Sequence, residues 1–186
     1  MNPMTHIAFL RAINVGGRAL VKMADLKKAF VAAGATNVQT YIQSGNVIFD
    51  APDSTTGQAK LFKSIQAKLN TLMGKEIDVM YRTHNDLQRM IRSDPFKNVD
   101  TTQDLKLYVA FLKDKPKKRP KLPLTAEKDG LKIIKVSGSD VFLVSVPVGK
   151  GRYGVPNLFV EKEFDTPATS RNWNTVQKIV KKTAET

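Results

Sequence analysis

Hydrophobic residues recur with two spacings in the first half of the chain, and these spacings mark out strands and helices. Alternation with period two predicts strands, whereas apolar residues three or four positions apart predict helices, each followed here by a glycine. In order, the predicted elements are a strand at 5–12, a helix at 23–33, strands at 37–43 and 46–50, a helix at 57–73 and a strand at 76–82. This β-α-β-β-α-β order predicts a ferredoxin-like subdomain over residues 1–82, with both helices on one face of an antiparallel sheet.

The second half of the chain repeats only part of this pattern. Its predicted elements are a short helix capped by Thr83, a strand at 106–113, a hairpin of 131–136 with 140–148, a helix near 157–163 and a final helix from about 170 to 183. The apolar stripe of the final helix begins with Trp173, which we expect to be buried. We predict an α+β fold in which residues 83–186 form a second, incomplete ferredoxin-like half, packed on the first as one compact unit.

Both faces of most predicted strands are apolar, which indicates sheets that are covered on both sides. The strand at 106–113 is an example, because Leu107, Val109 and Phe111 alternate with Tyr108, Ala110 and Leu112. RNA-recognition motifs share the β-α-β-β-α-β topology, but they stack bases on aromatic side chains of an open sheet face. Phe9 and Phe49 occupy the corresponding strands here. A covered sheet leaves them no platform, which argues against this mode of binding.

Charge changes this picture more than overall composition does, since the composition is that of an ordinary globular protein. The formal net charge is +13 and the sequence pI is 9.9. Residues 1–82 carry ten basic and five acidic residues and residues 83–186 carry twenty and twelve, so both halves are basic. The densest cluster is K-D-K-P-K-K-R-P-K at 113–121, with six cations. Such a field favours polyanionic partners, and it also suits a merely solvated surface.

Several absences narrow the range of functions. The chain has no cysteine, which excludes disulfides, thiolate metal sites and cysteine nucleophiles. Arg11 interrupts the only apolar stretch near the start, so no secretory signal is predicted there, and no window holds the roughly 18 apolar residues of a membrane helix. His6 and His84 are far apart, and neither has a second metal ligand three or four positions away. We expect a cytoplasmic protein with no metal, no cofactor and no membrane partner.

Five segments of the chain resemble one bacterial protein family, domain of unknown function 1697. They are F-L-R-A-I-N-V-G-G at 9–17, Y-I-Q-S-G-N-V at 41–47, G-K-G-R-Y-G at 149–154, F-V-E-K at 159–162 and P-A-T-S-R-N-W-N-T-V at 167–176. The resemblance implies an α+β fold and a bacterial, cytosolic origin, and it implies no activity, because the family is uncharacterised. Ala12 stands where the family pattern leads us to expect glycine, and Ala19 where that pattern often has a polar residue.

The glycine-rich segment at 149–154 formally matches G-x-G-x-x-G and lies between a predicted strand and a predicted helix. A dinucleotide site would also need a following parallel strand and an acidic residue about 20 positions on, and no such strand follows. Two other interpretations remain. The segment is a plain connecting loop, or its backbone N–H groups form an anion-binding nest that Lys150 and Arg152 assist.

Two further polar segments allow a structural and a functional interpretation. Asn14, Gly16 and Gly17 follow the first strand; they suit a tight strand exit, because glycine and asparagine tolerate positive φ, and they also suit a ligand cradle. Residues 170–172 are predicted to start the final helix, with Thr169 or Ser170 as its N-cap. The partial positive charge of a helix start attracts anions, which gives Arg171 and Asn172 a functional alternative.

These segments together yield a hypothesis of one shared anion-binding surface, lined by residues 11–17, 149–154 and 170–172. The predicted anion-binding residues are Arg11, Asn14, Gly16, Gly17, Lys150, Gly151, Arg152, Ser170, Arg171 and Asn172. The function that this favours is a binding module for nucleic acid or a phosphorylated metabolite. The alternative is a metal-independent enzyme of unrecognised type that acts on a small anionic substrate, for which the sequence identifies no catalytic residue.

Overall fold

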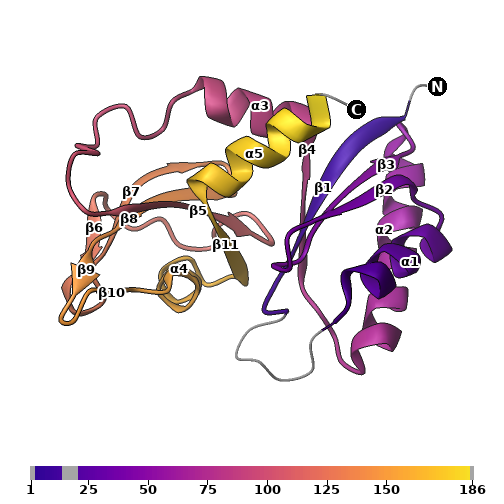
Figure 1. The fold of residues 1–186 in the computed structure, drawn as a ribbon, viewed down its shortest axis with the longest axis horizontal. Coiled ribbons are helices and arrows are strands. Elements are labelled where there is room, and N and C mark those ends of the chain that lie inside the picture. The colour runs from indigo at the N-terminus through magenta and orange to yellow at the C-terminus, as the bar shows by residue number, and fades with distance from the viewer. Residues whose placement is uncertain (1–2, 14–20, 185–186) are drawn as a thin grey trace. The chain divides into compact units, whose positions relative to one another are not determined.

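A computed structural model describes residues 3–13 and 21–184, and it combines five α-helices with antiparallel sheets (Figure 1). The predicted α+β class is therefore confirmed. The chain divides into two compact units, Met1–Asp86 and Leu87–Thr186. As separate subdomains, the halves 1–82 and 83–186 remain a prediction of the sequence. None of the helices in the described ranges is both long enough and apolar enough to cross a bilayer.

The first unit contains one four-stranded sheet and two long helices. Its elements are β1 (Met4–Leu10), α1 (Met23–Ala33), β2 (Thr36–Tyr41), β3 (Asn46–Ala51), α2 (Thr55–Met73) and β4 (Val79–Thr83). The strand order is β2-β3-β1-β4, and every neighbouring pair is antiparallel. The element order is the one that the hydrophobic spacing predicts, and the ferredoxin-like assignment itself stays a prediction.

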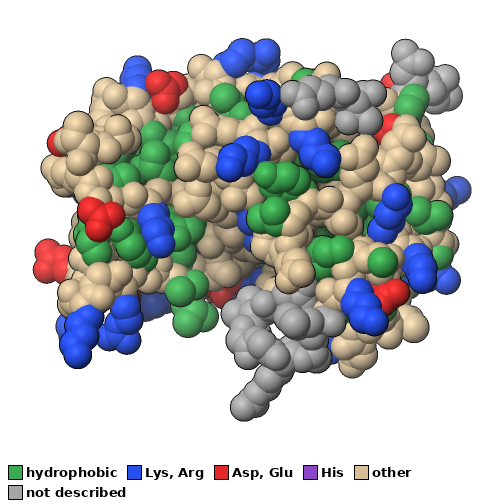
Figure 2. All heavy atoms as spheres, in the orientation of Figure 1, with side chains coloured by type: hydrophobic (Ala, Val, Ile, Leu, Met, Phe, Trp, Pro, Cys, Tyr) green, Lys and Arg blue, Asp and Glu red, His purple; other side chains and the backbone are tan. Residues whose placement is uncertain are grey.

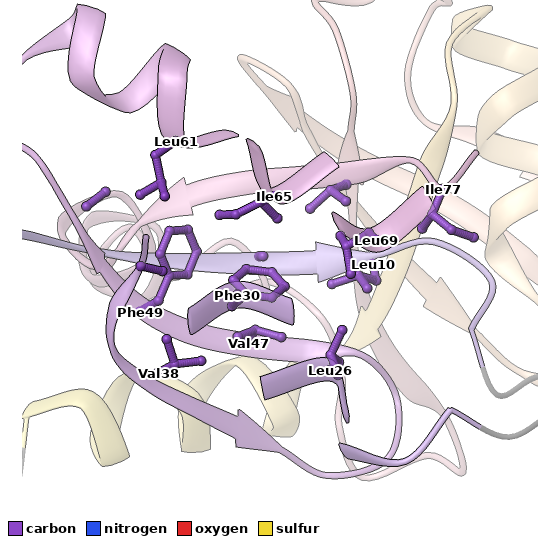
Figure 3. Close-up of a cluster of buried hydrophobic side chains, with 14 of the residues drawn as sticks. Leu10, Leu26, Phe30, Val38, Val47, Phe49, Leu61, Ile65, Leu69 and Ile77 are labelled. Atoms are coloured by element: carbon purple, nitrogen blue, oxygen red, sulfur yellow. The ribbon is translucent and has the colours of Figure 1, made fainter. Parts of the chain in front are cut away.

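Both helices of this unit cover the same face of the sheet, as predicted. Leu26 and Phe30 of α1 and the apolar side of α2 meet alternate side chains of the central strands in one buried cluster, part of which Figure 3 shows. The sheet contributes Ala8, Leu10, Val47, Phe49 and Val79, and α2 contributes Leu61, Ile65 and Leu69. The cluster forms because period two in the strands and period three to four in the helices each collect apolar groups on one side.

The opposite face of this sheet is apolar as well. Ile7, Phe9, Ile48 and Met80 point to that side and are each at most 5% exposed. Phe49 points to the helix side and is also fully buried. Phe9 and Phe49 therefore lie on opposite faces, and neither is available to stack a base.

The second unit is built on a five-stranded antiparallel sheet with the order β11-β5-β8-β7-β6. Its strands are β5 (Lys106–Leu112), β6 (Leu124–Ala126), β7 (Leu131–Ser137), β8 (Asp140–Ser145) and β11 (Ala168–Asn172), and a separate hairpin pairs β9 (Pro147–Val148) with β10 (Arg152–Tyr153). The helical elements are α3 (His84–Arg92), the 3-10 turn η1 (Glu127–Asp129), α4 (Pro156–Phe164) and α5 (Trp173–Ala184). The first residues of α3 still belong to the first unit.

Helices cover both faces of the five-stranded sheet. Val160 and Phe164 of α4 pack against Ala110, Leu112 and other side chains of one face. On the other face, Trp173 at the start of α5 meets Phe96 and Phe142 edge to face, with ring centroids 5.2 and 6.3 Å away. Trp173 is 7% exposed, which confirms its predicted burial.

The sequence prediction is wrong at the start of the last helix. Residues 168–172 form β11, which pairs with β5 over its whole length, and α5 begins only at Trp173. Thr169, Ser170 and Asn172 resemble helix-capping residues locally, but backbone pairing with a strand more than fifty residues earlier decides their conformation. The short strands β6 and β10 were likewise not predicted, and β9 lies within the predicted strand 140–148 but pairs with β10 in a separate hairpin.

Candidate anion-binding site

Arg11 is fixed at the exit of β1 by contacts to Asp78. Its backbone N–H donates to the Asp78 carbonyl oxygen (2.9 Å), and its Nη1 lies 3.9 Å from Asp78 Oδ2. Both side chains are partly exposed, so solvent weakens this ion pair. The next residue, Ala12, has a left-handed backbone with φ 52°. That conformation explains why the family pattern leads us to expect glycine at this position, since only glycine adopts it without steric cost.

Replacing Ala12 by glycine should therefore stabilise the protein. We expect Ala12→Gly to raise the free energy of unfolding by about 0.5–1 kcal/mol, because relief of left-handed strain exceeds the entropy that glycine adds to the unfolded chain. The measurement is urea denaturation followed by circular dichroism. Ala29→Gly, the same chemical change inside helix α1, is the control and should cost about 1 kcal/mol. If both variants lose stability, the backbone at Ala12 is not strained.

The glycine-rich segment 149–154 forms a tight hairpin. Gly149 and Gly151 have positive φ of 57° and 73°, and the N–H of Gly151 donates to the carbonyl oxygen of Gly149 (2.9 Å). This turn joins β9 to β10; the exposed Lys150 lies in the turn, and the exposed Arg152 is the first residue of β10. A dinucleotide loop instead passes directly from a strand into a helix. The glycines are explained by the turn, which favours the connecting-loop interpretation.

The hairpin also carries a polar cluster that the sequence did not reveal. The Tyr153 hydroxyl donates to Asp104, and Lys106 Nζ lies 3.9 Å above the centre of the Tyr153 ring. The hydrogen bond to Asp104 raises the pKa of Tyr153, and desolvation adds to the effect. This cluster is no metal centre: among the residues that the structure describes, no three His, Asp or Glu side chains lie together in a way that would hold a metal ion.

Ser170 and Asn172 point to the side of the sheet covered by α4, and each has a structural hydrogen bond. The backbone N–H and the hydroxyl of Ser170 both donate to Asn157 Oδ1 (2.8 and 2.7 Å). Asn172 Oδ1 accepts from the backbone N–H of Asn174 (3.0 Å), so Asn172 caps α5. Ser170 is therefore not the N-cap of the last helix, which is a correction of the sequence prediction.

Arg171 lies on the opposite face of β11 from Ser170 and Asn172, because side chains alternate along a strand. It is only 7% exposed, and its Nη1 donates to Thr169 Oγ1 and to the Ser170 carbonyl oxygen (both 2.8 Å). Burial lowers the pKa of Arg171 to about 10, so it remains charged at neutral pH. Arg171 is thus a buried strand residue and not, as predicted, a first-turn residue of a helix, while its role in anion binding stays a prediction.

The structure brings two of the three predicted segments to one end of strand β5. Asn172 is the register partner of Tyr108, and Tyr153 of the hairpin lies on Lys106, two positions before Tyr108. Arg11 belongs to the other unit, and Asn14, Gly16 and Gly17 lie outside the described residues. A common surface of all three segments therefore stays a prediction.

The basic segment, residues 113–121, offers more accessible positive charge than the predicted site does. All six of its cations, Lys113, Lys115, Lys117, Lys118, Arg119 and Lys121, are exposed. The five from Lys115 onward form no ion pair with any residue in the described ranges. The backbone of the segment is held in place, because the N–H groups of Lys113 and Lys117 donate to the carbonyl oxygens of Pro167 (2.9 Å) and Phe164 (3.2 Å).

Positive side chains are also common outside the basic segment. Figure 2 shows Lys and Arg side chains spread over the face that it draws, with fewer Asp and Glu among them. The basic segment differs from this general surface in the density of its cations along the chain and in its attachment to the body of the second unit.

Comparison with known proteins gives a family and a fold. A model of the family described as protein of unknown function (DUF1697) matches residues 4–142. The solved structure of a conserved bacterial protein from Streptococcus pneumoniae is similar with a TM-score of 0.61 and 17% sequence identity, covering 97% of this chain and 98% of that chain. No curated protein matches the sequence. At this identity, the structural likeness concerns the fold alone.

Proposed function

We propose that this protein, which belongs to the DUF1697 family of proteins of unknown function, binds nucleic acid through its basic segment. The observation that carries the proposal is the row of six exposed cations in nine residues, fixed to the second unit by backbone hydrogen bonds. Lysine and arginine side chains that neutralise phosphates release bound counterions, and this release drives sequence-independent binding.

A chain of phosphates suits this arrangement better than a single phosphorylated metabolite does. A small anion is usually held by groups that converge on it from several elements. The cations of the basic segment instead follow one another along the backbone, and the prolines Pro116 and Pro120 between them limit its freedom. Several phosphates in a row could each meet one cation. We therefore favour a polymeric anion over a metabolite.

The alternative of a metal-independent enzyme finds its best support in the cluster of Asp104, Lys106 and Tyr153. A tyrosine acts as a general base or nucleophile only when it loses its proton. The raised pKa of Tyr153 keeps the hydroxyl protonated at neutral pH, where it donates a hydrogen bond. This cluster is better suited to holding the hairpin in place than to proton abstraction. We therefore favour a binding function over a catalytic one.

Binding to a mixed-sequence, single-stranded oligonucleotide should be weak, tolerant of sequence and steeply dependent on salt. If all six cations of the basic segment meet phosphates, the affinity should fall roughly 300-fold between about 50 and 200 mM salt. Fluorescence anisotropy titrations across this range measure the slope of the logarithm of the binding constant against the logarithm of the salt concentration. The triple variant Lys117→Gln, Lys118→Gln, Lys121→Gln should lower the magnitude of that slope by about 2.

The matched control removes the same charge from another surface. Lys60, Lys63 and Lys68 are exposed on α2, and changing all three to Gln should leave the salt slope nearly unaltered. Absence of binding at low salt, or an equal loss in the control, would show that the basic segment is not the binding site.

A further inference from the structure

Beside the basic segment lies a pocket of about 280 Å³, which is a second feature of this surface in addition to its charge. One wall consists of Pro116, Arg119 and Pro120 of the segment together with Leu122, which follows it. The other side is formed by Val136 of β7 and Phe164 at the end of α4. All of these residues belong to the second unit.

The pocket has an apolar floor and one charged group at its side. Phe164 is almost fully buried, and Leu122 and Val136 are partly buried against the same cluster as Phe164. Arg119 is the only charged residue among the described residues that line the pocket, and it is exposed. The hydrogen bond from the Lys117 N–H to the Phe164 carbonyl oxygen holds the segment above this floor. The position of the pocket wall is therefore fixed by contacts within the second unit.

Its volume is near the lower limit of the range in which proteins hold small molecules, about 300–1,000 Å³. One flat ring system with apolar faces would fill such a space. The occupant must also tolerate the surrounding cations, which disfavours a basic peptide side chain. An unpaired nucleobase combines an apolar ring face with a phosphate on each side, and it matches both the floor and the charge of the rim.

We propose that this pocket takes one unpaired base of a single-stranded nucleic acid whose phosphates lie along the basic segment. The proposal rests on the nucleic-acid binding proposed above and adds a preference for single strands. Within a duplex the bases are stacked and paired, and drawing one out costs a few kcal/mol. The planar guanidinium of Arg119 can stack on the face of the base, as arginine does in other RNA sites.

The test compares three fluorescent ligands of equal length in anisotropy titrations. They are an oligothymidylate of about 12 nucleotides, a chain of the same length that keeps every sugar and phosphate but carries no base, and the matching duplex. We expect the oligothymidylate to bind about tenfold more tightly than the abasic chain, and more tightly than the duplex. Equal affinity for the oligothymidylate and the abasic chain, or tighter binding of the duplex, overturns the pocket proposal and leaves nucleic-acid binding intact. If none of the three binds at low salt, both proposals fail.

Three point variants separate base stacking and filling of the pocket from charge. Arg119→Lys keeps the charge but loses the planar group, so it should reduce the preference for oligothymidylate over the abasic chain. Lys118→Gln removes a charge next to the pocket without changing the residues that line it, so it should lower the affinity for all three ligands by a similar factor. An unchanged preference in Arg119→Lys, together with an unchanged preference when Val136→Phe fills the pocket, counts against insertion of a base.

Discussion

Trp173→Ala should remove about 3–5 kcal/mol from the free energy of unfolding, as truncation of a buried tryptophan usually does. Trp173 is 7% exposed at the start of α5 and makes edge-to-face contacts with Phe96 and Phe142. Its removal opens a cavity and also ends both aromatic contacts, which add about 0.5–1.5 kcal/mol each in comparable pairs. α5 should then be the helix whose attachment to the sheet weakens most.

The measurement is urea denaturation followed by circular dichroism, because Trp173 is the only tryptophan and its fluorescence is lost in the variant. Leu158→Ala is the control, since Leu158 is 76% exposed on α4 and its truncation should change stability by less than about 0.5 kcal/mol. A loss below about 1 kcal/mol for Trp173→Ala would show that the side chain does not anchor α5.

Gly130→Ala should lower the free energy of unfolding by a similar amount, for two reasons that act together. Gly130 has φ +62°, and a Cβ atom at this position would lie 2.4 Å from the carbonyl oxygen of Val146. The backbone N–H of Val146 also donates to the Gly130 carbonyl oxygen (2.8 Å). The backbone segments at Gly130 and Val146 therefore cannot move apart without loss of that hydrogen bond. Left-handed strain and overpacking together should cost about 3–5 kcal/mol.

Gly138→Ala provides a closely matched comparison for Gly130→Ala. Gly138 has nearly the same φ, +61°, but no atom lies within 4 Å of the position that its Cβ would take. Only the backbone strain of about 1–2 kcal/mol should remain. The difference between the two variants in chemical denaturation thus measures the close contact to Val146. Equal losses would mean that the backbone near Gly130 yields at little cost.

The parts of the fold that follow from local periodicity could be predicted from the sequence. In α1, Leu26 and Phe30 are four positions apart and both are buried. The predicted start of α3 is also confirmed, because Thr83 Oγ1 accepts from the N–H of Asp86 (3.0 Å) and Asp86 accepts from Thr83 in return. Such signals involve residues three or four positions apart, and tertiary contacts then add to what local preference already favours.

The features that were predicted wrongly, or not predicted, depend on residues that are distant in the sequence. The segment A-T-S-R-N at 168–172 has the composition of a helix cap, yet its pairing with β5 makes it a strand. The same strand geometry sends Arg171 to one face and Ser170 and Asn172 to the other, which the helical interpretation could not anticipate. The contact of Tyr153 with Asp104 joins residues 49 positions apart, and no spacing in the sequence signals it.

The candidate site follows the same division. The basic segment is visible as a run of like charges, and the structure adds that it is held against the end of α4. The pocket beside Arg119 was not predictable, since Val136 and Phe164 reach it from elements far along the chain. Charge density can be read from a sequence, whereas the enclosure of a pocket needs the packing of the chain.

The position of the basic segment has a further consequence for the behaviour of the protein in solution. Two residues separate the end of the segment from Leu124, where β6 begins. β6 is a strand of three residues at one end of the five-stranded sheet order. Unpaired edge strands invite addition of a strand from another molecule, and lysine and proline residues in or beside an edge are a common protection against aggregation. The charges that we assign to nucleic acid would thus also act as gatekeepers of this edge. Variants that neutralise them should therefore precipitate at lower protein concentration than the matched α2 variant with the same net charge.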